Sequence, residues 1–307
     1  EFLLTALTKP ETPLRFEKFM EAALYHPEFG YYTTEILDVG RTGDFSTSAT
    51  LHSVLGEAIA KWAADTRKSA LPRGRWNLIE VGAGNGDLAH TVLRNIPRLQ
   101  RRELRYHIVE KSPILLKRQK EKLGNPCQWH DCMQDALAAT DGSALIFSNE
   151  LVDAFPCRLF EWDGSVWQEI ALELDGEKFR ERLMVVGLPD STAFQIPNPQ
   201  SGQRVEIHES YRNWLQSWKG HWKTGAMLTI DYGDVVDQLY HRRPNGTLRA
   251  YHHQQRIEGT KTYHHMGQQD LTADVNFSDL QIWVEQIGWK NARLETQRDF
   301  ILRTIPQ

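Results

Sequence analysis

The sequence predicts an α/β fold in which a mostly parallel sheet carries helices on both faces. A helical extension precedes this sheet, and an antiparallel β-rich subdomain is inserted into it. Three observations support the prediction: an apolar strand that runs into a glycine turn, an alternation of strand-like and helix-like segments after residue 76, and about 70 residues between the strands at 144–148 and 226–230 that contain β-like alternation and are too many for one crossover helix.

The glycine turn follows the first predicted strand of the sheet. Residues 76–81 are largely apolar, Gly82, Gly84 and Gly86 come directly after them, and the periodic stretch 88–93 predicts a helix. Strand, glycine turn and helix in this order form the Rossmann-like arrangement that brings backbone close to a nucleotide-like ligand. The turn therefore predicts a nucleoside-binding site.

Acidic residues around the turn favour S-adenosylmethionine as the ligand. A dinucleotide site places a pyrophosphate at the helix N-terminus and has a third glycine where this chain has Asp87. Glu80 and Asp87 would repel a pyrophosphate, but carboxylates suit an ammonium, a sulfonium and a ribose diol. Glu110 ends the next strand, roughly 20 residues past the turn, where an acid binds ribose hydroxyls. NAD uses the same acid, so a dinucleotide site stays open as the alternative.

Hydrophobic periodicity predicts the remaining elements. We expect helices at 14–25, 51–62, 113–123, 208–218 and 278–287, and strands at 105–109, 126–130, 144–148 and 226–230. Two final strands, 291–295 and 299–304, would close the sheet. In the insertion, alternation at 158–162, 166–174 and 179–186 predicts strands joined by hairpin turns at Asp163-Gly164 and Asp175-Gly176.

These elements predict three regions. An N-terminal helical and loop region spans 1–75, the Rossmann-like core spans 76–156 and 226–307, and the inserted β-rich subdomain spans 157–225. We expect the insertion to be a partner-binding surface because of its turns and its five tryptophans, which are Trp162, Trp167, Trp214, Trp218 and Trp222.

Composition narrows the classes of function. The net charge is −4 and the basic clusters are short, so we expect no nucleic-acid partner. No apolar run approaches the ~20 residues of a membrane-spanning helix. Three cysteines fit a reducing compartment, and the run Cys127–Cys132 lacks the second ligand pair of a zinc site, so we expect no metal. The chain does not begin with Met, so a removed targeting segment stays open.

A polar segment follows the strand predicted at 144–148. In an open parallel sheet, ligands lie at the carboxyl ends of the strands. We therefore expect Asn149 near the cofactor and Glu150 and Asp153 near the methyl acceptor, where two carboxylates would hold a guanidinium or an ammonium group. The alternative is a helix start whose acids merely suit the helix dipole.

Two other acids are candidate site residues, and for each an ordinary structural role is equally compatible with the sequence. Asp44, in the loop 40–47, would close over the cofactor or position the acceptor, or it belongs to an ordinary turn before a helix. Asp131 follows the strand at 126–130, where a carboxylate would meet the adenine amino group, or it is an exposed turn residue. The pairs His252-His253 and His264-His265 are either a base or part of a surface loop.

Several segments resemble the MidA family of S-adenosylmethionine-dependent methyltransferases, whose mitochondrial members act as complex I assembly factors. The likeness runs nearly end to end and rests on segments 24–32, 43–45, 55–57, 80–86, 109–113, 149–156, 231–233, 246–251 and 270–277. It implies a Rossmann-like class I methyltransferase sheet, S-adenosylmethionine as cofactor and, in the mitochondrial branch, methylation of an arginine on a complex I subunit. It also implies that the Asp44 loop belongs to the site.

Two departures from the family pattern affect the acceptor side. Residues 47–50 read Thr-Ser-Ala-Thr where relatives usually have Thr-Ala-Pro-Glu, and Leu151-Val152 replace a Phe-Phe pair. The cofactor site therefore carries over better than the acceptor site.

The sequence thus predicts a methyltransferase in which Glu80, Gly82, Gly84, Gly86, Glu110, Asp131 and Asn149 bind S-adenosylmethionine, while Glu150, Asp153 and Asp44 serve catalysis. The expected acceptor is an arginine of a partner protein, and a homodimer is possible. We expect a bacterial member in the cytoplasm and a eukaryotic one in the mitochondrial matrix. The rival hypothesis is an assembly or chaperone module that binds the cofactor without turnover.

Overall fold

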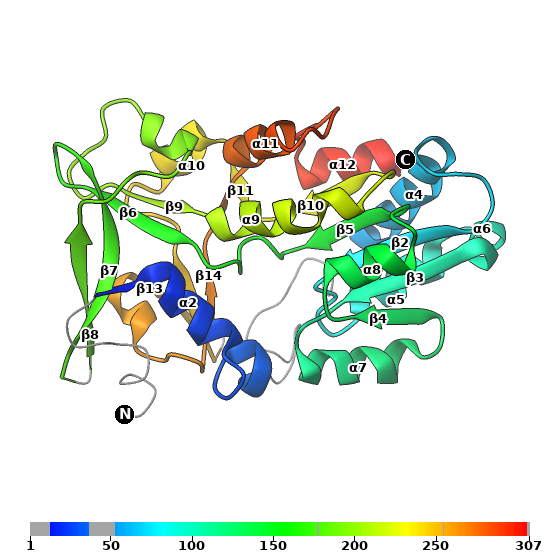
Figure 1. Cartoon of the computed structure of the whole chain (residues 1–307), viewed down its shortest axis with the longest axis horizontal. Coiled ribbons are helices and arrows are strands. Elements are labelled where there is room, and N and C mark those ends of the chain that lie inside the picture. The colour runs from blue at the N-terminus through cyan, green and yellow to red at the C-terminus, as the bar shows by residue number, and fades with distance from the viewer. Residues whose placement is uncertain (1–12, 37–52, 177, 254, 306–307) are drawn as a thin grey trace. The chain divides into compact units, whose positions relative to one another are not determined.

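The computed structural model describes residues 13–36, 53–176, 178–253 and 255–305 (Figure 1). The chain divides into two compact units. We call the first the mixed unit, with residues Glu1–Glu35, Val152–Trp214 and Asp231–Ala292. The second is the parallel-sheet unit, with residues Ile36–Leu151, Leu215–Ile230 and Arg293–Gln307.

The parallel-sheet unit contains a five-stranded sheet whose strands all run parallel, in the order β10-β5-β2-β3-β4. The strands are β2 (Trp76–Val81), β3 (Leu104–Val109), β4 (Cys127–His130), β5 (Leu145–Asn149) and β10 (Met227–Ile230). The chain moves outward from β2 to β4 and then returns to the other side of β2, so the strand order reverses between β2 and β5. Ligands bind at the carboxyl ends of the strands around such a reversal.

Helices flank this sheet within the same unit. They are α4 (Ser53–Ala70), α5 (Asp87–Asn95), α6 (Arg98–Glu103), α7 (Pro113–Leu123), α8 (Met133–Ala139) and α12 (Gln297–Thr304). The start of α7 illustrates the local cause: the Ser112 hydroxyl accepts a hydrogen bond from the Leu115 amide at 3.2 Å, Pro113 opens the helix, and Gly124 follows its end with a φ of 66°. The α/β fold is confirmed.

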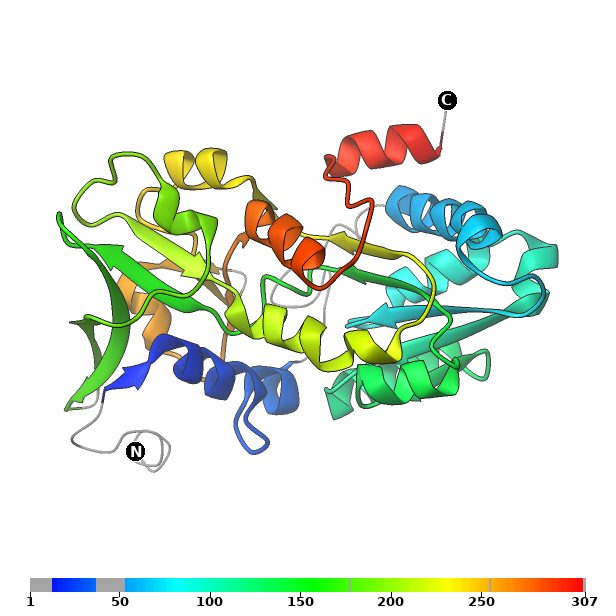
Figure 2. The same ribbon diagram turned by 45° about the horizontal axis from the view of Figure 1, so that its top comes forward.

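The end of the chain differs from the prediction. We expected strands at 291–295 and 299–304, but the structure has no strand at 291–295 and places residues 297–304 in α12, beside α4 (Figure 2). The Thr296 hydroxyl accepts a hydrogen bond from the Asp299 amide at 3.1 Å, which satisfies a free amide in the first turn. Thr and Asp at this spacing are a helix-start signal, and this local signal explains why the segment is helical.

The mixed unit contains mainly antiparallel sheet. Its largest sheet has the order β1-β7-β6-β9, and β8 pairs with β7. These strands are β1 (Leu14–Arg15), β6 (Arg158–Trp162), β7 (Trp167–Asp175), β8 (Lys178–Met184) and β9 (Arg204–Ile207). The predicted turn after Trp162 is confirmed, because Asp163 accepts hydrogen bonds from the amides of Ser165 and Val166.

Smaller elements complete the mixed unit. A three-stranded sheet has the order β13-β12-β14, with β12 (Arg249–His252), β13 (Gln255–Glu258) and β14 (Asp270–Thr272). A parallel pair joins β11 (Gly233–Asp234) and β15 (Val275–Asn276). The helices are α2 (Phe16–Tyr25), α10 (Val236–Arg242) and α11 (Phe277–Gln286), and α9 (Glu209–Trp218) begins in this unit.

The two units do not follow the domain boundaries expected above. Residues 231–292 group with the antiparallel sheets, although their sequence suggested the core. The functional division into 1–75, a core and the insertion 157–225 therefore stays a proposal. Among the tryptophans expected on a partner surface, Trp167 and Trp218 are buried. Within the described segments, no helix combines the length and apolar character that crossing a bilayer requires.

Candidate cofactor and acceptor site

The glycine turn lies in the parallel-sheet unit between β2 and α5. Gly82, Gly84 and Gly86 have φ angles of 70°, 54° and 84°, which L side chains rarely adopt. The Gly82 amide donates to the Val109 carbonyl at 3.0 Å, and a Cβ on Gly82 would lie 2.9 Å from Leu151 Cδ1. Glycine at these positions avoids the strain of a side chain and leaves no Cβ between the backbone and a ligand.

Glu110 is fixed beside this turn. Its Oε1 accepts a hydrogen bond from the Ser112 amide at 2.9 Å, and its Oε2 accepts one from Gln119 Nε2 at 2.9 Å. Burial raises the pKa of Glu110, while these hydrogen bonds and one from the Lys111 backbone oppose the rise. Each carboxylate oxygen retains a further lone pair, so Glu110 still has acceptors for a ribose diol.

Gln119 was missed by the sequence analysis. The same Nε2 group also donates to the Gly84 carbonyl at 2.8 Å, and Oε1 accepts from Trp129 Nε1 at 3.2 Å. Gln119 is fully buried, although it lies in the mostly polar helix α7. A buried glutamine that joins the turn to Glu110 positions both groups, and only its long-range contacts identify it.

Glu80 has a different environment from the one expected. It is buried and accepts a hydrogen bond from the Tyr106 hydroxyl at 2.6 Å. Burial raises its pKa to about 8, and the charge of Glu110 adds to the rise, so Glu80 is largely protonated at neutral pH. Asp87, the second acid expected to repel a pyrophosphate, forms an ion pair with Lys122 at 2.7 Å. Neither residue therefore presents an isolated charge to a ligand.

The end of β5 forms the other edge of the site. Glu150 has a φ of 51°, a left-handed conformation for a non-glycine residue, and its amide donates to the Ile230 carbonyl at 2.9 Å. Asn149 Nδ2 donates to Glu150 Oε1 at 3.3 Å. Within the described part of the chain, Ser148 Oγ and Asn149 Oδ1 are buried without a hydrogen-bond partner. Such atoms suit a polar ligand, because leaving them unpaired costs about 1–3 kcal/mol each.

The remaining predicted site residues are Asp131, Asp153 and Asp44. Asp131 is exposed and follows β4. Asp153 is buried and belongs to the mixed unit, whereas Glu150 belongs to the parallel-sheet unit. Asp44 lies outside the described residues. Of the four candidate histidines, His252 and His265 stack with ring centroids 4.3 Å apart, both in the mixed unit.

The residues present fit S-adenosylmethionine. The glycine turn offers backbone, Glu110 offers acceptors for ribose hydroxyls, and Asn149 offers an unpaired carbonyl oxygen. Among the described residues, no cluster of three or more His, Cys, Asp or Glu side chains has the arrangement of a metal site.

A family model described as "Putative S-adenosyl-L-methionine-dependent methyltransferase" matches residues 58–294. The chain belongs to this family. Its cofactor is S-adenosylmethionine, as the glycine turn and the acids predicted, and the suspected MidA relationship is confirmed.

Curated relatives extend the comparison. The chain is 26% identical over 312 residues to "Protein arginine methyltransferase NDUFAF7 homolog, mitochondrial" from Caenorhabditis elegans, which covers 89% of this chain and 68% of that protein. It is 26% identical over 301 residues to "Protein arginine methyltransferase NDUFAF7, mitochondrial" from Danio rerio, which covers 88% of this chain and 68% of that protein. The chain thus spans about two thirds of their length.

Solved structures support the fold. A COG1565 superfamily member from Burkholderia thailandensis bound to S-adenosyl-homocysteine has a TM-score of 0.78 and 24% identity, covering 94% of this chain and 75% of that one. A COG1565 superfamily protein from the same organism, solved in native form, has a TM-score of 0.73 and 25% identity, covering 94% of this chain and 74% of that one.

Proposed function

We propose that this methyltransferase transfers a methyl group to an arginine of a partner protein. The observation that carries the proposal is Glu150, which the chain holds in a left-handed conformation at the carboxyl end of β5, next to the buried unpaired oxygen of Asn149. Backbone in this conformation is costly and clusters at functional sites. A carboxylate is the natural partner of a guanidinium group.

Bound S-adenosylmethionine would supply a methyl group activated by its sulfonium, and the sulfur would take the electron pair of the carbon–sulfur bond as the new bond to nitrogen formed. The chain's own residues have two tasks. Glu150 orients the guanidinium so that one nitrogen faces the methyl carbon, and it accepts the proton that this nitrogen loses. Glu110, Gln119 and the glycine turn would hold the cofactor, and the unpaired Asn149 Oδ1 would offer it a further acceptor.

The substitution Glu150→Gln tests this assignment. It keeps the size of the side chain and a carbonyl oxygen but removes the charge and the proton acceptor. We expect S-adenosylmethionine affinity to stay nearly unchanged and transfer to arginine-containing protein or peptide to be abolished, as measured by calorimetry and by methyl incorporation. The matched control is Glu121→Gln, an exposed residue of α7 in the same unit.

Two results would contradict the proposal. Unchanged turnover in Glu150→Gln would remove Glu150 from the reaction. A wild-type chain that binds S-adenosylmethionine and a partner protein but incorporates no methyl group would favour the non-catalytic assembly module.

The support for a protein substrate comes from the relatives, whose names describe protein arginine methyltransferases. We propose that the partner of this chain is a protein and not a nucleic acid. We also propose that the chain forms a homodimer, which light scattering would detect. The relatives are named mitochondrial, so we propose the mitochondrial matrix for a eukaryotic source and the cytoplasm for a bacterial one. Asp44, Asp131 and Asp153 remain proposed site residues.

A further inference from the structure

A cavity lies at the amino ends of β3 and β4 in the parallel-sheet unit. Its volume is about 370 Å³, within the range of small-molecule pockets, and its lining comes from α5, α6, β3 and the segment before β4. Leu104 is the first residue of β3, and Pro126 directly precedes β4. Glu110, the proposed ribose ligand, follows the carboxyl end of β3. The cavity is therefore at the opposite edge of the sheet from the proposed cofactor site.

One part of the lining is apolar. Leu93 and Leu104 are partly buried, and Leu123, at the end of α7, belongs to the hydrophobic core of this unit. Tyr106 also lines the cavity, and because its hydroxyl already donates to Glu80 at 2.6 Å, it contributes mainly its ring. A ligand with an apolar body would remove that body from water by contact with these side chains.

The other part of the lining is basic. His90 and Arg94 come from α5 and Arg101 from α6, and the lining contains no Asp or Glu. Arg101 Nη1 donates to the carbonyls of Leu93 and Arg94 at 3.2 and 3.4 Å, which holds its guanidinium group at the end of α5. A guanidinium group has five N–H donors, so Arg101 retains donors for a ligand.

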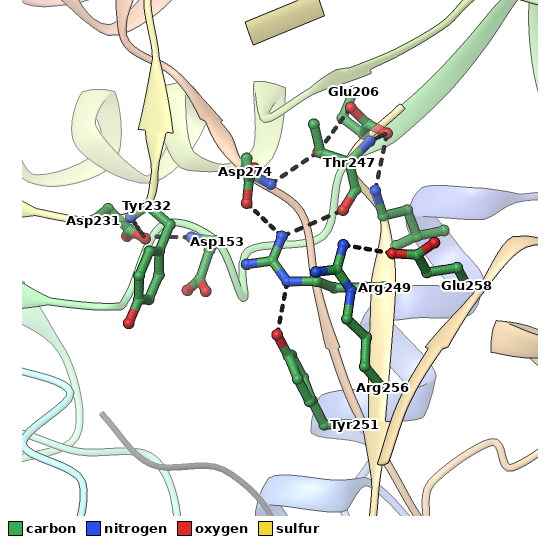
Figure 3. A network of polar contacts seen from close by, with 11 residues as sticks. Asp153, Glu206, Asp231, Tyr232, Thr247, Arg249, Tyr251, Arg256, Glu258 and Asp274 are labelled. Atoms are coloured by element: carbon green, nitrogen blue, oxygen red, sulfur yellow. Dashed lines mark hydrogen bonds and ion pairs between the residues drawn. The ribbon is translucent and has the colours of Figure 1, made fainter. Parts of the chain in front are cut away.

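The two arginines of the cavity differ from other arginines of the chain in their partners. Arg249, in the mixed unit, forms an ion pair with Asp274 (Figure 3). Across the described ranges, neither Arg94 nor Arg101 forms an ion pair with a carboxylate. Their charges are therefore not compensated by the part of the chain that the structure describes.

The acids of the neighbouring helices are already paired elsewhere. Helix α5 has one acid, Asp87, which lies 2.7 Å from Lys122, and α6 has one acid, Glu103, which lies 3.0 Å from Arg67. Neither carboxylate thus neutralises the basic part of the cavity. A cavity whose basic side chains have no carboxylate partner attracts anions.

We infer that this cavity, which we call the arginine cavity, binds a small organic anion that has a carboxylate on an apolar body. A guanidinium group pairs with a carboxylate through two parallel hydrogen bonds. An inorganic anion would use the basic side chains but would leave the apolar lining in contact with water. The inference does not depend on the proposed function, because the arginine cavity contains no residue proposed to bind the cofactor or the acceptor.

The test uses the full chain and three probes, which are 4-phenylbutyrate, 4-phenylbutylamine and acetate. The amine keeps the apolar body and reverses the charge, and acetate keeps the carboxylate and lacks the apolar body. We expect 4-phenylbutyrate to bind with a dissociation constant of about 1 mM, as ligand-observed NMR would measure. We expect the other two probes to bind at least about tenfold more weakly.

Three variants place this binding in the arginine cavity. Arg94→Met removes a charge that has no carboxylate partner among the described residues, and we expect it to weaken 4-phenylbutyrate binding about fivefold. Arg102→Met is the matched control, because Arg102 is an exposed residue of α6 outside the lining, and it should bind as the wild type does. Leu93→Trp keeps every charge but fills the cavity, so we expect binding to weaken about tenfold or more.

Several outcomes overturn the inference. They are the absence of 4-phenylbutyrate binding to the wild type, equal affinity in Arg94→Met and Arg102→Met, unchanged affinity in Leu93→Trp, or binding of the amine or acetate as tight as that of 4-phenylbutyrate. A failure of the proposed function would look different, because it would remove methyl transfer to arginine and leave these probe affinities as expected.

Discussion

Gln119 Nε2 donates to Glu110 Oε2 at 2.9 Å and, from the same amide group, to the Gly84 carbonyl at 2.8 Å. One buried side chain thus ties the acid after β3 to the glycine turn after β2. This amide therefore sets the distance between Glu110, the proposed ribose ligand, and the glycine turn, whose backbone would meet the cofactor. It does so although 35 residues separate Gly84 from Gln119.

The first prediction concerns this amide. Gln119→Met keeps the side chain's length and removes its hydrogen bonds to Glu110, Gly84 and Trp129, so Glu110 loses a donor in a buried site. We expect the affinity for S-adenosylmethionine to fall about tenfold, equivalent to about 1.4 kcal/mol, by calorimetric titration. Gln128→Met, at an exposed position of β4, is the control. Equal affinities in the two variants would show that Gln119 does not position the site.

A second prediction concerns Gly82. An alanine there adopts a φ of 70° and places its Cβ 2.9 Å from Leu151 Cδ1. We expect the free energy of unfolding to fall by about 1–2 kcal/mol because of the backbone conformation. We also expect cofactor affinity to fall more than in the control variant. Gly259→Ala is the control, because its φ is 65° and a Cβ there would meet no atom within 4 Å. Cofactor affinity that falls equally in both variants would contradict a role for the turn.

The third prediction is a dependence of stability on pH. His107 is fully buried in β3, and burial lowers its pKa to about 4, with the neighbouring His130 adding to the effect. Its Nδ1 and His130 Nε2 are 2.9 Å apart. The unfolded chain binds this proton near pH 6.5 and the folded chain only near pH 4, so stability falls as the pH drops through this window.

We expect His107 to lower the free energy of unfolding by about 2 kcal/mol at pH 5 relative to pH 7. His107→Gln should reduce this loss, as urea unfolding at the two pH values would measure. His241→Gln, at an exposed position of α10, should leave it unchanged. A loss of the same size in His107→Gln and the wild type would assign the effect to other groups.

The fourth prediction compares two ion pairs in one sheet. Arg158 Nε and Glu169 Oε1 are 2.8 Å apart, and both residues are buried. Arg158→Met leaves Glu169 buried without its main partner, so we expect a loss of about 3–5 kcal/mol in the free energy of unfolding. The pair of Arg182 and Glu173 is exposed, with 3.5 Å between the groups, so Arg182→Met should cost less than about 1 kcal/mol. Equal losses by urea denaturation would contradict this account.

Local signals predicted most of the parallel-sheet unit. The strand, glycine turn and helix at 76–95 are as expected, because glycine spacing and apolar periodicity act over a few residues. The strand predicted at 299–304 was wrong, because Thr296 caps a helix that covers these residues. Glu80 stays a proposed cofactor residue. Its hydrogen bond from Tyr106 could not be predicted from the sequence, since the side chain that a buried strand residue meets depends on the register of the neighbouring strand.

The sequence by itself determined the fold class, the glycine turn and the family, because these depend on residue types at short fixed spacings. The tertiary structure alone decided that Gln119 joins Glu110 to the turn, that Glu80 is buried and accepts a hydrogen bond from Tyr106, and that Tyr32 donates one to Asp270. The physical reason is that hydrogen bonds and burial link residues far apart in the chain, and no local pattern records such partners.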